Sequence, residues 1–241
     1  MKSKKYKTNK NLIKKAVVNS KKTALFIGIS GGIDSAVCLS MLIDWFGKDM
    51  VKPIYLPIET HTNVSEIKLL SEQLGIDIPT VDLTEWFHQT IAALQIKNRD
   101  NINNLKPKLR AVYLASQAFE YNGLVVSCLN YDEYYLGYFT KNGDSAGDIY
   151  PMLNFCKAEI YKLAKDLQIP TTIINKKPSA DLYENQLDEI ELQLTYQEID
   201  LYLQFKKVSK QVIDRIKLLK NNNAHKHTLD KFLIENGLRK T

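Results

Sequence analysis

The stretch Gly28-Ile29-Ser30-Gly31-Gly32-Ile33-Asp34-Ser35-Ala36 decides the fold class of this 241-residue chain. It continues an apolar run that begins at Ala24 and predicts a buried strand, and it opens a segment with the apolar spacing of a helix. Two adjacent glycines let the backbone turn tightly and expose its N–H groups, and the start of the following helix adds a favourable dipole. A strand, a turn and a helix in this order predict a cradle for phosphate groups.

Asp34 places a carboxylate inside this predicted cradle. The loop lacks the glycine spacing of the dinucleotide fingerprint G-x-G-x-x-G and the lysine of a Walker A loop. A carboxylate beside phosphates is repulsive unless a divalent cation lies between them, so the sequence predicts Mg²⁺ as a cofactor. Ser30 and Ser35 add hydroxyl donors for the phosphates. The alternative, an ordinary Gly-Gly turn with a capping serine, is disfavoured by the predicted strand and helix on either side.

Short β-like runs alternate with longer helical patterns along the rest of the chain. Strands are expected at residues 24–29, 51–57, 79–83 and 124–129. Helices are expected at residues 35–47, 63–74, 86–94, 106–121, 157–167, 195–203 and 209–219. This alternation predicts an α/β fold in which helices cover both faces of a parallel sheet. Ligands of such folds bind at the carboxyl ends of the strands, where the glycine-rich loop lies.

Composition excludes several classes of protein. Apolar residues make up 44% of the chain and charged residues 25%, which is typical of a globular protein. The chain has neither an apolar run long enough to span a bilayer nor the apolar region of a secretory signal. The cysteines Cys38, Cys128 and Cys156 form neither an even set nor a Cys-x-x-Cys pair. We therefore expect a cytoplasmic protein without a membrane segment, structural disulfides or a zinc ribbon.

The net charge of +6 comes from one end of the chain. Residues 1–33 contain nine lysines and no acid, so the remaining residues carry a net charge of −3. We expect residues 1–22 to form a lysine-rich arm, solvated in its first ten residues and an amphipathic helix from about Leu12, before a single domain at residues 23–241. On this interpretation residues 2–10 are dispensable. The alternative, in which the arm contacts RNA, stays open, although a nucleic-acid partner is not expected.

The loop resembles the pyrophosphate-binding loop of the ATP pyrophosphatases. Downstream blocks are similar to those of the NAD synthetase family, at residues 137–144, Asp148, Pro151, Lys157, 178–182, 186–189, Tyr196, 199–200 and 225–226. Because the blocks follow one another in the family's order from about residue 24 to 226, the chain is identified as a member of this family. The resemblance implies an adenine nucleotide alpha hydrolase-like, Rossmann-like fold. It is to the ammonia-dependent form, since 241 residues leave no room for a glutaminase domain.

The resemblance also implies an activity. Members of the family use ATP and ammonia to convert deamido-NAD into NAD, AMP and pyrophosphate through an adenylated intermediate. They are homodimers that bind deamido-NAD near the subunit interface. We therefore expect a homodimeric ligase that acts on small molecules.

Site residues follow from the matching positions, and each is an expectation from the resemblance. ATP contacts are expected from Gly28, Ile29, Ser30, Gly31, Gly32, Ile33, Asp34, Ser35, Cys128, Lys157 and Ser179. Deamido-NAD contacts are expected from Lys108, Lys141, Asp148, His225 and Lys226. Asp34 and Glu133 are expected to hold Mg²⁺, and Asp34 and Lys157 to act in catalysis.

Several positions depart from the family pattern. Cys128 and Cys156 replace threonines, Gln193 replaces a glycine, and the pattern that begins at His225-Lys226 is lost from His227 onward. Lys108 replaces an arginine and loses its two-pronged hydrogen-bonding geometry. These departures leave two alternatives open: a tRNA-modifying ATP pyrophosphatase, and a relative that binds nucleotides without catalysis.

Overall fold

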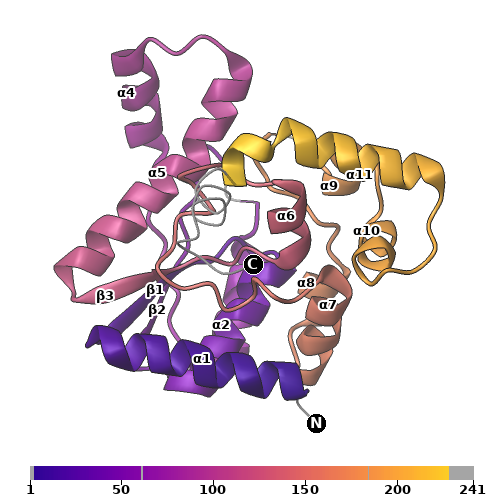
Figure 1. Ribbon diagram of the computed structural model, residues 1–241. Helices are drawn as coiled ribbons and strands as arrows, with labels where there is room; N and C mark the ends of the chain where they lie inside the picture. Colours follow the sequence, from indigo (N-terminus) through magenta and orange to yellow (C-terminus); the bar gives the residue numbers. More distant parts are fainter. Residues whose placement is uncertain (1–2, 61, 184, 228–241) are drawn as a thin grey trace.

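The computed structural model describes residues 3–60, 62–183 and 185–227. In this part of the chain the sheet has three parallel strands in the order β2-β1-β3 (Figure 1). The central strand β1 (Ala24–Gly28) pairs with β2 (Val51–Ile54) on one side and with β3 (Gly123–Val126) on the other. In this register Ile27 lies opposite Pro53 and Val126. The glycine-rich loop therefore leaves the sheet at the carboxyl end of its central strand.

Side chains of β1 alternate between two apolar clusters because successive residues of a strand point to opposite faces. Leu25 and Ile27 pack with α2 (Ile33–Phe46), whereas Ala24 and Phe26 pack against α5 (Arg99–Glu120). The first cluster also takes residues from α1 (Lys4–Ser20), α3 (Val64–Leu74), α7 (Lys157–Asp166) and α8 (Thr171–Asn175), and the second from α4 (Thr84–Leu94). The predicted α/β fold with helices on both faces is confirmed.

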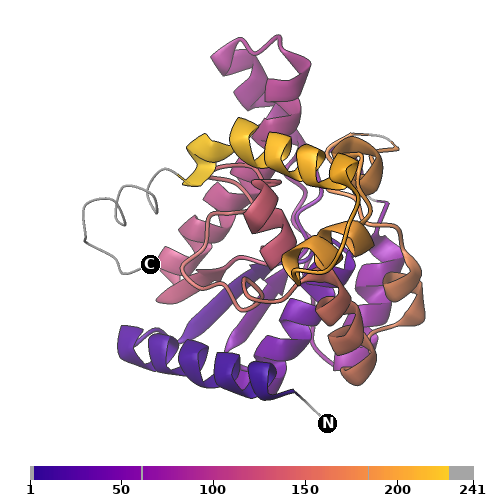
Figure 2. The same cartoon turned by 45° about the vertical axis from the view of Figure 1, so that its right-hand side comes forward.

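A third apolar cluster joins the later helices. It contains Leu136, Tyr196, Ile199 and Ile216 and connects α6 (Tyr131–Leu136) to α10 (Tyr196–Leu203) and α11 (Lys210–Asn222). The short helices α9 (Asp188–Leu192) and η1 (Ala224–His227) complete this part of the molecule. In Figure 2, α11 runs across the upper part of the molecule, above α6 and α10. These helices bring residues distant in sequence toward the end of the sheet where the glycine-rich loop lies.

Several elements differ from the sequence-based expectation. The strand expected at residues 79–83 is reduced to one bridge, between Tyr55 and Thr80. Prolines at positions 53, 57 and 79 have no N–H to donate, so the ladder cannot extend in this region. Helix α5 begins at Arg99 instead of about residue 106, because the Asn98 side chain accepts a hydrogen bond from Asn101 N–H and caps the helix. Pro107 thus lies inside the helix. The helices α6, α8 and α9 were not expected.

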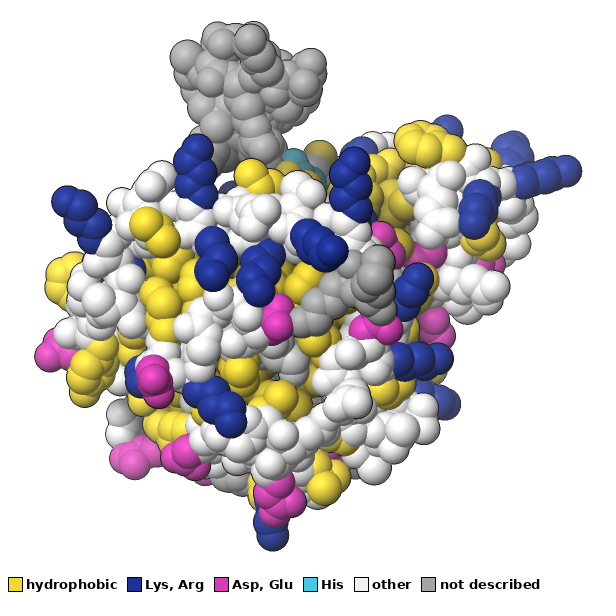
Figure 3. Space-filling view, turned by 90° about the horizontal axis from the view of Figure 1, so that it is seen from below, with side chains coloured by type: hydrophobic (Ala, Val, Ile, Leu, Met, Phe, Trp, Pro, Cys, Tyr) yellow, Lys and Arg dark blue, Asp and Glu magenta, His cyan; other side chains and the backbone are white. Residues whose placement is uncertain are grey.

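Helix α1 starts at Lys4 and is packed against the body of the protein. Tyr6 is 1% exposed, and its hydroxyl donates to the carboxylate of Asp44 on α2 (2.9 Å). The buried Asn9 side chain donates to the Pro151 carbonyl. The interpretation of the first ten residues as a solvated leader is therefore wrong for residues 4–10. Lysine side chains spread over the face on which α1 lies (Figure 3). Residues 1–2 of the expected arm and 228–241 of the expected domain lie outside the described residues.

The cysteines are unpaired within the described residues: Cys38 and Cys156 are buried, and Cys128 is half-buried. None of the helices described here combines the length and the apolar character needed to cross a membrane. The apolar segments of the chain are instead used in the three clusters around the sheet.

Candidate active site

A cavity of about 600 Å³ lies at the carboxyl ends of the strands. This volume is within the usual range for a site that binds a small molecule. The glycine-rich loop forms one wall, α5 a second wall, and the segment of residues 176–192 a third. Of the expected ATP contacts, the cavity is lined by Gly28, Ile29, Ser30, Gly32, Ile33, Asp34, Ser35, Cys128, Lys157 and Ser179. The structure therefore brings together nearly all the residues that the sequence assigned to ATP.

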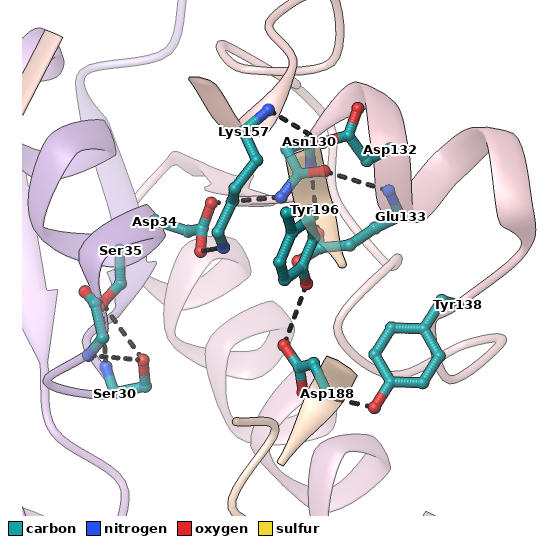
Figure 4. A network of polar contacts seen from close by, with 11 residues as sticks. Ser30, Asp34, Ser35, Asn130, Asp132, Glu133, Tyr138, Lys157, Asp188 and Tyr196 are labelled. Carbon is teal, nitrogen blue, oxygen red and sulfur yellow. Dashed lines mark hydrogen bonds and ion pairs between the residues drawn. The ribbon is translucent and has the colours of Figure 1, made fainter. Parts of the chain in front are cut away.

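The conformation of the glycine-rich loop is held by hydrogen bonds to the hydroxyl groups of its own two serines. Ser35 Oγ accepts from Ser30 N–H (3.2 Å) and donates to the Gly32 carbonyl (3.1 Å), and Ser30 Oγ accepts from Gly32 N–H (3.2 Å). Figure 4 shows the two serines side by side at the start of α2. Gly32 precedes α2 without a side-chain cap, so the first N–H groups of the helix are open to an anion. The geometry fits the predicted phosphate cradle.

Lys157 is the buried cation of the site. Its side chain is 2% exposed, and its Nζ forms an ion pair with the Asp34 carboxylate (Figure 4). The same Nζ lies 4.7 Å from the centre of the Tyr196 ring, within the range of a cation–π contact. Burial disfavours the charged form of Lys157, but Asp34 and Glu133 outweigh it and raise the pKa of the lysine above its ordinary value. Lys157 is thus a fixed positive charge next to the phosphate cradle.

Glu133 lies near this pair in the first turn of α6. It forms a capping box with Asn130, whose side chain accepts from Glu133 N–H (3.0 Å) and donates to Asp34 Oδ1 (3.1 Å). Burial and, next, the charge of Asp34 raise the pKa of Glu133 well above its ordinary value. Only Asp34 is paired with the lysine, and a cation between the two carboxyl groups would favour the ionised form of both. Their oxygen ligands and charge fit a divalent cation, although the described residues contain no cluster of three metal-binding side chains.

Two further carboxylates lie behind Lys157, at the start of α7. Asp132 Oδ2 accepts from Lys157 N–H (2.8 Å), and Asp200 Oδ2 accepts from Ala158 N–H (2.9 Å). Both side chains are buried, and Oδ1 of each has no hydrogen-bond partner among the described residues. Burial and the nearby Asp200 raise the pKa of Asp132 to about 7. The two acids hold the backbone that carries Lys157.

The Tyr196 ring that contacts Lys157 is held in place by a network of hydrogen bonds between hydroxyl and carboxylate groups. Tyr196 donates to Asp188 Oδ2 (2.9 Å), and Tyr138 donates to Asp188 Oδ1 (3.2 Å) and Glu191 (2.8 Å). Figure 4 shows Asp188 between the two tyrosines. This network connects α9 and α10 to the residues around Lys157.

Of the residues expected to contact deamido-NAD, one lines the cavity and the others do not. Lys226 lines the cavity and donates to the Gly137 and Phe139 carbonyls (2.6 Å each). Asp148 accepts from Val125 N–H (2.7 Å), and this bond connects the segment between α6 and α7 to β3. Lys108, Lys141, Asp148 and His225 do not line the cavity of this single chain.

Arg110 lines the cavity, although the sequence-based assignment did not include it. Its Nε donates to the Leu56 carbonyl (2.9 Å), and burial lowers its pKa. The available signal was its position, two residues after Lys108, which the resemblance assigned to deamido-NAD. Asn130 also had a signal, the Asn-x-x-Glu spacing of a capping box. Asn63, which contacts the glycine-rich loop, had none.

Comparisons with known proteins add evidence from sequence and from solved structures. The sequence profile of the NAD synthase family matches residues 5–231. A protein of Finegoldia magna named NH(3)-dependent NAD(+) synthetase is 40% identical over 194 residues, with 79% of this chain and 80% of that protein covered. A protein of the same name from Mycoplasmopsis pulmonis is 36% identical over 219 residues, with 90% and 85% covered.

A solved structure from Francisella tularensis superposes with a TM-score of 0.87 at 34% sequence identity. The match covers 92% of this chain and 94% of that chain, and the protein is called an NMN synthetase. The similarity therefore extends over nearly the whole described fold and includes the helices that complete the cavity.

Proposed function

The chain belongs to the NAD synthase family, and on this premise we propose that it catalyses the ATP-dependent amidation of deamido-NAD by ammonia. The products are NAD, AMP and pyrophosphate. One observation carries the proposal: the buried ion pair of Lys157 and Asp34 lies beside an open phosphate cradle, in the cavity that Arg110 also lines. A fixed lysine and free backbone N–H groups are the groups that a triphosphate needs.

The reaction has two steps. A nicotinate carboxylate oxygen attacks the α-phosphorus of ATP, and the bond from that phosphorus to the bridging oxygen breaks, so pyrophosphate leaves. Ammonia then attacks the activated carbonyl carbon, AMP departs with the electrons of the C–O bond, and the nitrogen releases a proton to water. The loop N–H groups and Lys157 bind and orient the triphosphate and stabilise its charge, which accounts for catalysis by positioning and electrostatics.

We propose Mg²⁺ as the cofactor, held by Asp34 and Glu133. When bound, it supplies charge neutralisation for the phosphate oxygens of ATP. The raised pKa of Glu133, caused by its burial and by the nearby Asp34 charge, supports this assignment, because a cation between the two groups would favour the ionised form of both. The ion pair with Lys157 and the hydrogen bond from Asn130 hold the Asp34 carboxylate in a fixed direction, toward the side of the site where Glu133 lies.

We also propose a homodimer in the cytoplasm. Val112 and Phe119, seven residues apart on α5, are 53% and 88% exposed, which is typical of a face that packs against a partner. Lys108 precedes Val112 by four residues and shares this face of the helix. A deamido-NAD site near the subunit interface would explain why Lys108, Lys141 and His225 lie outside the cavity of one chain. The unpaired cysteines support a reducing compartment.

A second candidate substrate is nicotinate mononucleotide. The Francisella tularensis structure, with 34% identity, is called an NMN synthetase, and NMN is the product of amidating that mononucleotide. The reacting carboxylate is the same in both candidates, and only the adenylate half of the dinucleotide differs. Contacts from Lys108, Lys141, Asp148, His225 and Lys226 are proposed for the larger substrate and would matter less for the smaller one.

The proposed function is tested with the purified protein, ATP, Mg²⁺ and ammonium. Deamido-NAD, nicotinate mononucleotide or transfer RNA is added in separate reactions. We expect AMP, pyrophosphate and one amide product in equal amounts, with deamido-NAD giving the higher kcat/KM. Higher kcat/KM with the mononucleotide would support the second candidate. AMP formation only with transfer RNA, or none with any acceptor, would overturn the proposal.

A further inference from the structure

The buried side chain of Asn63 joins two walls of the cavity. Asn63 precedes α3 and is 6% exposed. Its Nδ2 donates to the Ser30 carbonyl (2.7 Å) and to Asp181 Oδ2 (3.0 Å), and its Oδ1 accepts from Lys176 Nζ. An asparagine in this position commonly caps its own helix, but Asn63 makes no such bond. Its amide is used entirely by the glycine-rich loop and by the segment of residues 176–181.

The contact with Ser30 fixes the direction of one peptide group in the loop. The Ser30 carbonyl and the Gly31 N–H belong to the same planar trans peptide, so they point in opposite directions. While Asn63 holds the carbonyl, this peptide cannot rotate and present an electronegative oxygen to a bound phosphate. The loop also rests on the Asn63 side chain: Gly31 has φ +79°, and a Cβ there would lie 2.7 Å from Asn63 Cβ.

The other two contacts hold the opposite wall. Lys176 Nζ lies 3.7 Å from the Asp181 carboxylate, and both residues line the cavity. Between these charges, Asn63 accepts from the ammonium group and donates to the carboxylate. An amide can do both at once, whereas a carboxylate or an apolar side chain of similar size cannot.

We propose that Asn63 is a positioning residue for ATP that couples the glycine-rich loop to residues 176–181. Because both walls already have the conformation that binds ATP, the loop does not have to reorganise when ATP enters. The free energy of binding is then not reduced by the entropy cost of ordering the loop. The inference rests on the proposed function, because it takes ATP as the ligand. It predicts an effect on ATP binding that is separate from the chemical step.

The test measures ATP binding in the presence of Mg²⁺ by calorimetry, and then steady-state kinetics. Asn63→Asp keeps the size of the side chain but loses the donor to Ser30 and repels Asp181. We expect Kd and KM for ATP to rise at least tenfold, with kcat changed less than threefold and KM for the nicotinate substrate less than twofold. Lys68→Ala, at an exposed position of the same helix, is the matched control and should change none of these values.

Two variants at Asp181 keep the inference testable even if Asn63→Asp does not fold, because the Asp181 side chain is 41% exposed. Removing a negative charge near the phosphates should by itself tighten ATP binding. If Asp181 acts through Asn63, Asp181→Ala instead weakens ATP binding about threefold. Asp181→Asn also removes the charge but retains an oxygen that can accept from Asn63, so it should bind ATP at least as tightly as the wild type.

The outcomes separate the inference from the proposed function. The inference alone would be overturned if Asn63→Asp bound ATP with the wild-type affinity. It would also be overturned if Asp181→Ala bound ATP more tightly than the wild type. Wild-type protein that does not bind ATP would overturn the proposed function and the inference with it. A loss of kcat in Asn63→Asp with KM for ATP unchanged would indicate a merely structural role and would also overturn the inference.

Discussion

Lys157 Nζ and the carboxylate of Asp34 form an ion pair across 123 positions of sequence, and the lysine is almost completely buried. The pair belongs both to the proposed ATP site and to the packed interior. A substitution on either side therefore changes activity and stability together.

Asp34→Asn should lower the free energy of unfolding by about 3 kcal/mol, because it leaves a buried lysine without its counter-ion. Glu133→Gln should change stability little, since burial and Asp34 already raise the pKa of Glu133 and favour its neutral form. Both should reduce turnover at least 100-fold. The double variant Asp34→Asn/Lys157→Met should recover stability but not activity, as measured by urea denaturation. Equal stability of the two single variants would contradict this account.

The N-terminal helix should contribute to stability through Tyr6. We expect Tyr6→Ala to cost about 3 kcal/mol as a buried aromatic truncation, and Tyr6→Phe about 1 kcal/mol for the hydrogen bond to Asp44. Lys7→Ala, at an exposed position of the same helix, is the control. Deleting residues 2–10 should lower the melting temperature in a thermal scan. A deletion variant with the wild-type melting temperature would restore the interpretation of this segment as a solvated leader.

Asp132 should make stability depend on pH. Its pKa is raised from 3.8 to about 7 in the folded protein, so the folded state holds this proton more tightly than the unfolded state. The contribution of Asp132 to the free energy of unfolding is therefore greatest below about pH 4, and it is lost as the pH rises toward 7. The stability of Asp132→Asn relative to wild type should therefore increase by about 3 kcal/mol from pH 5 to pH 8. Urea denaturation at both pH values measures this, with the exposed Asp166→Asn as control.

Lys108→Arg should tighten deamido-NAD binding by about 1 kcal/mol and leave ATP binding unchanged. Arginine offers two parallel donors where lysine offers one, and two-pronged contacts to phosphate or carboxylate are stronger. Titration calorimetry with each ligand measures both effects. Weaker or unchanged deamido-NAD binding would show that the surroundings of Lys108 have adapted to lysine.

Arg110→Gln, two residues further along α5, should instead lower kcat/KM by at least tenfold, because this guanidinium lines the cavity. Circular dichroism should show an intact fold. Arg110→Lys should recover part of the loss, since it restores the charge without the planar geometry. Full activity of Arg110→Gln would remove this residue from the site.

The sequence predicted the elements whose conformation depends mainly on residues close to one another along the chain. The strand, loop and helix from Ala24 to Phe46 follow from local apolar periodicity and two glycines. The docking of Tyr6 did not, because its partner Asp44 is 38 positions away. The strand expected at residues 79–83 failed because three prolines limit its pairing, an effect that apolar content alone does not reveal.

For the site, family blocks identified Asp34, Glu133 and Lys157, but not how they contact one another. The sequence assigned no role to three residues that support the site, although Tyr196 belongs to one of the family blocks. Asn63, Asp132 and Tyr196 act through contacts made only after α3, α6 and α10 pack around the loop. No local pattern distinguishes such a residue from an ordinary polar or aromatic side chain. Those contacts are products of tertiary structure.

The strand order β2-β1-β3 has a consequence for synthesis of the chain. β1 ends at Gly28, but its second neighbour begins only at Gly123, so one edge of the central strand lacks its native partner until 95 more residues have been made. At typical elongation speeds this takes on the order of 5–20 s. The tyrosine that covers Lys157 leaves the ribosome later still. A nascent chain therefore completes the proposed nucleotide site near the end of translation, and an incomplete chain cannot form the full site.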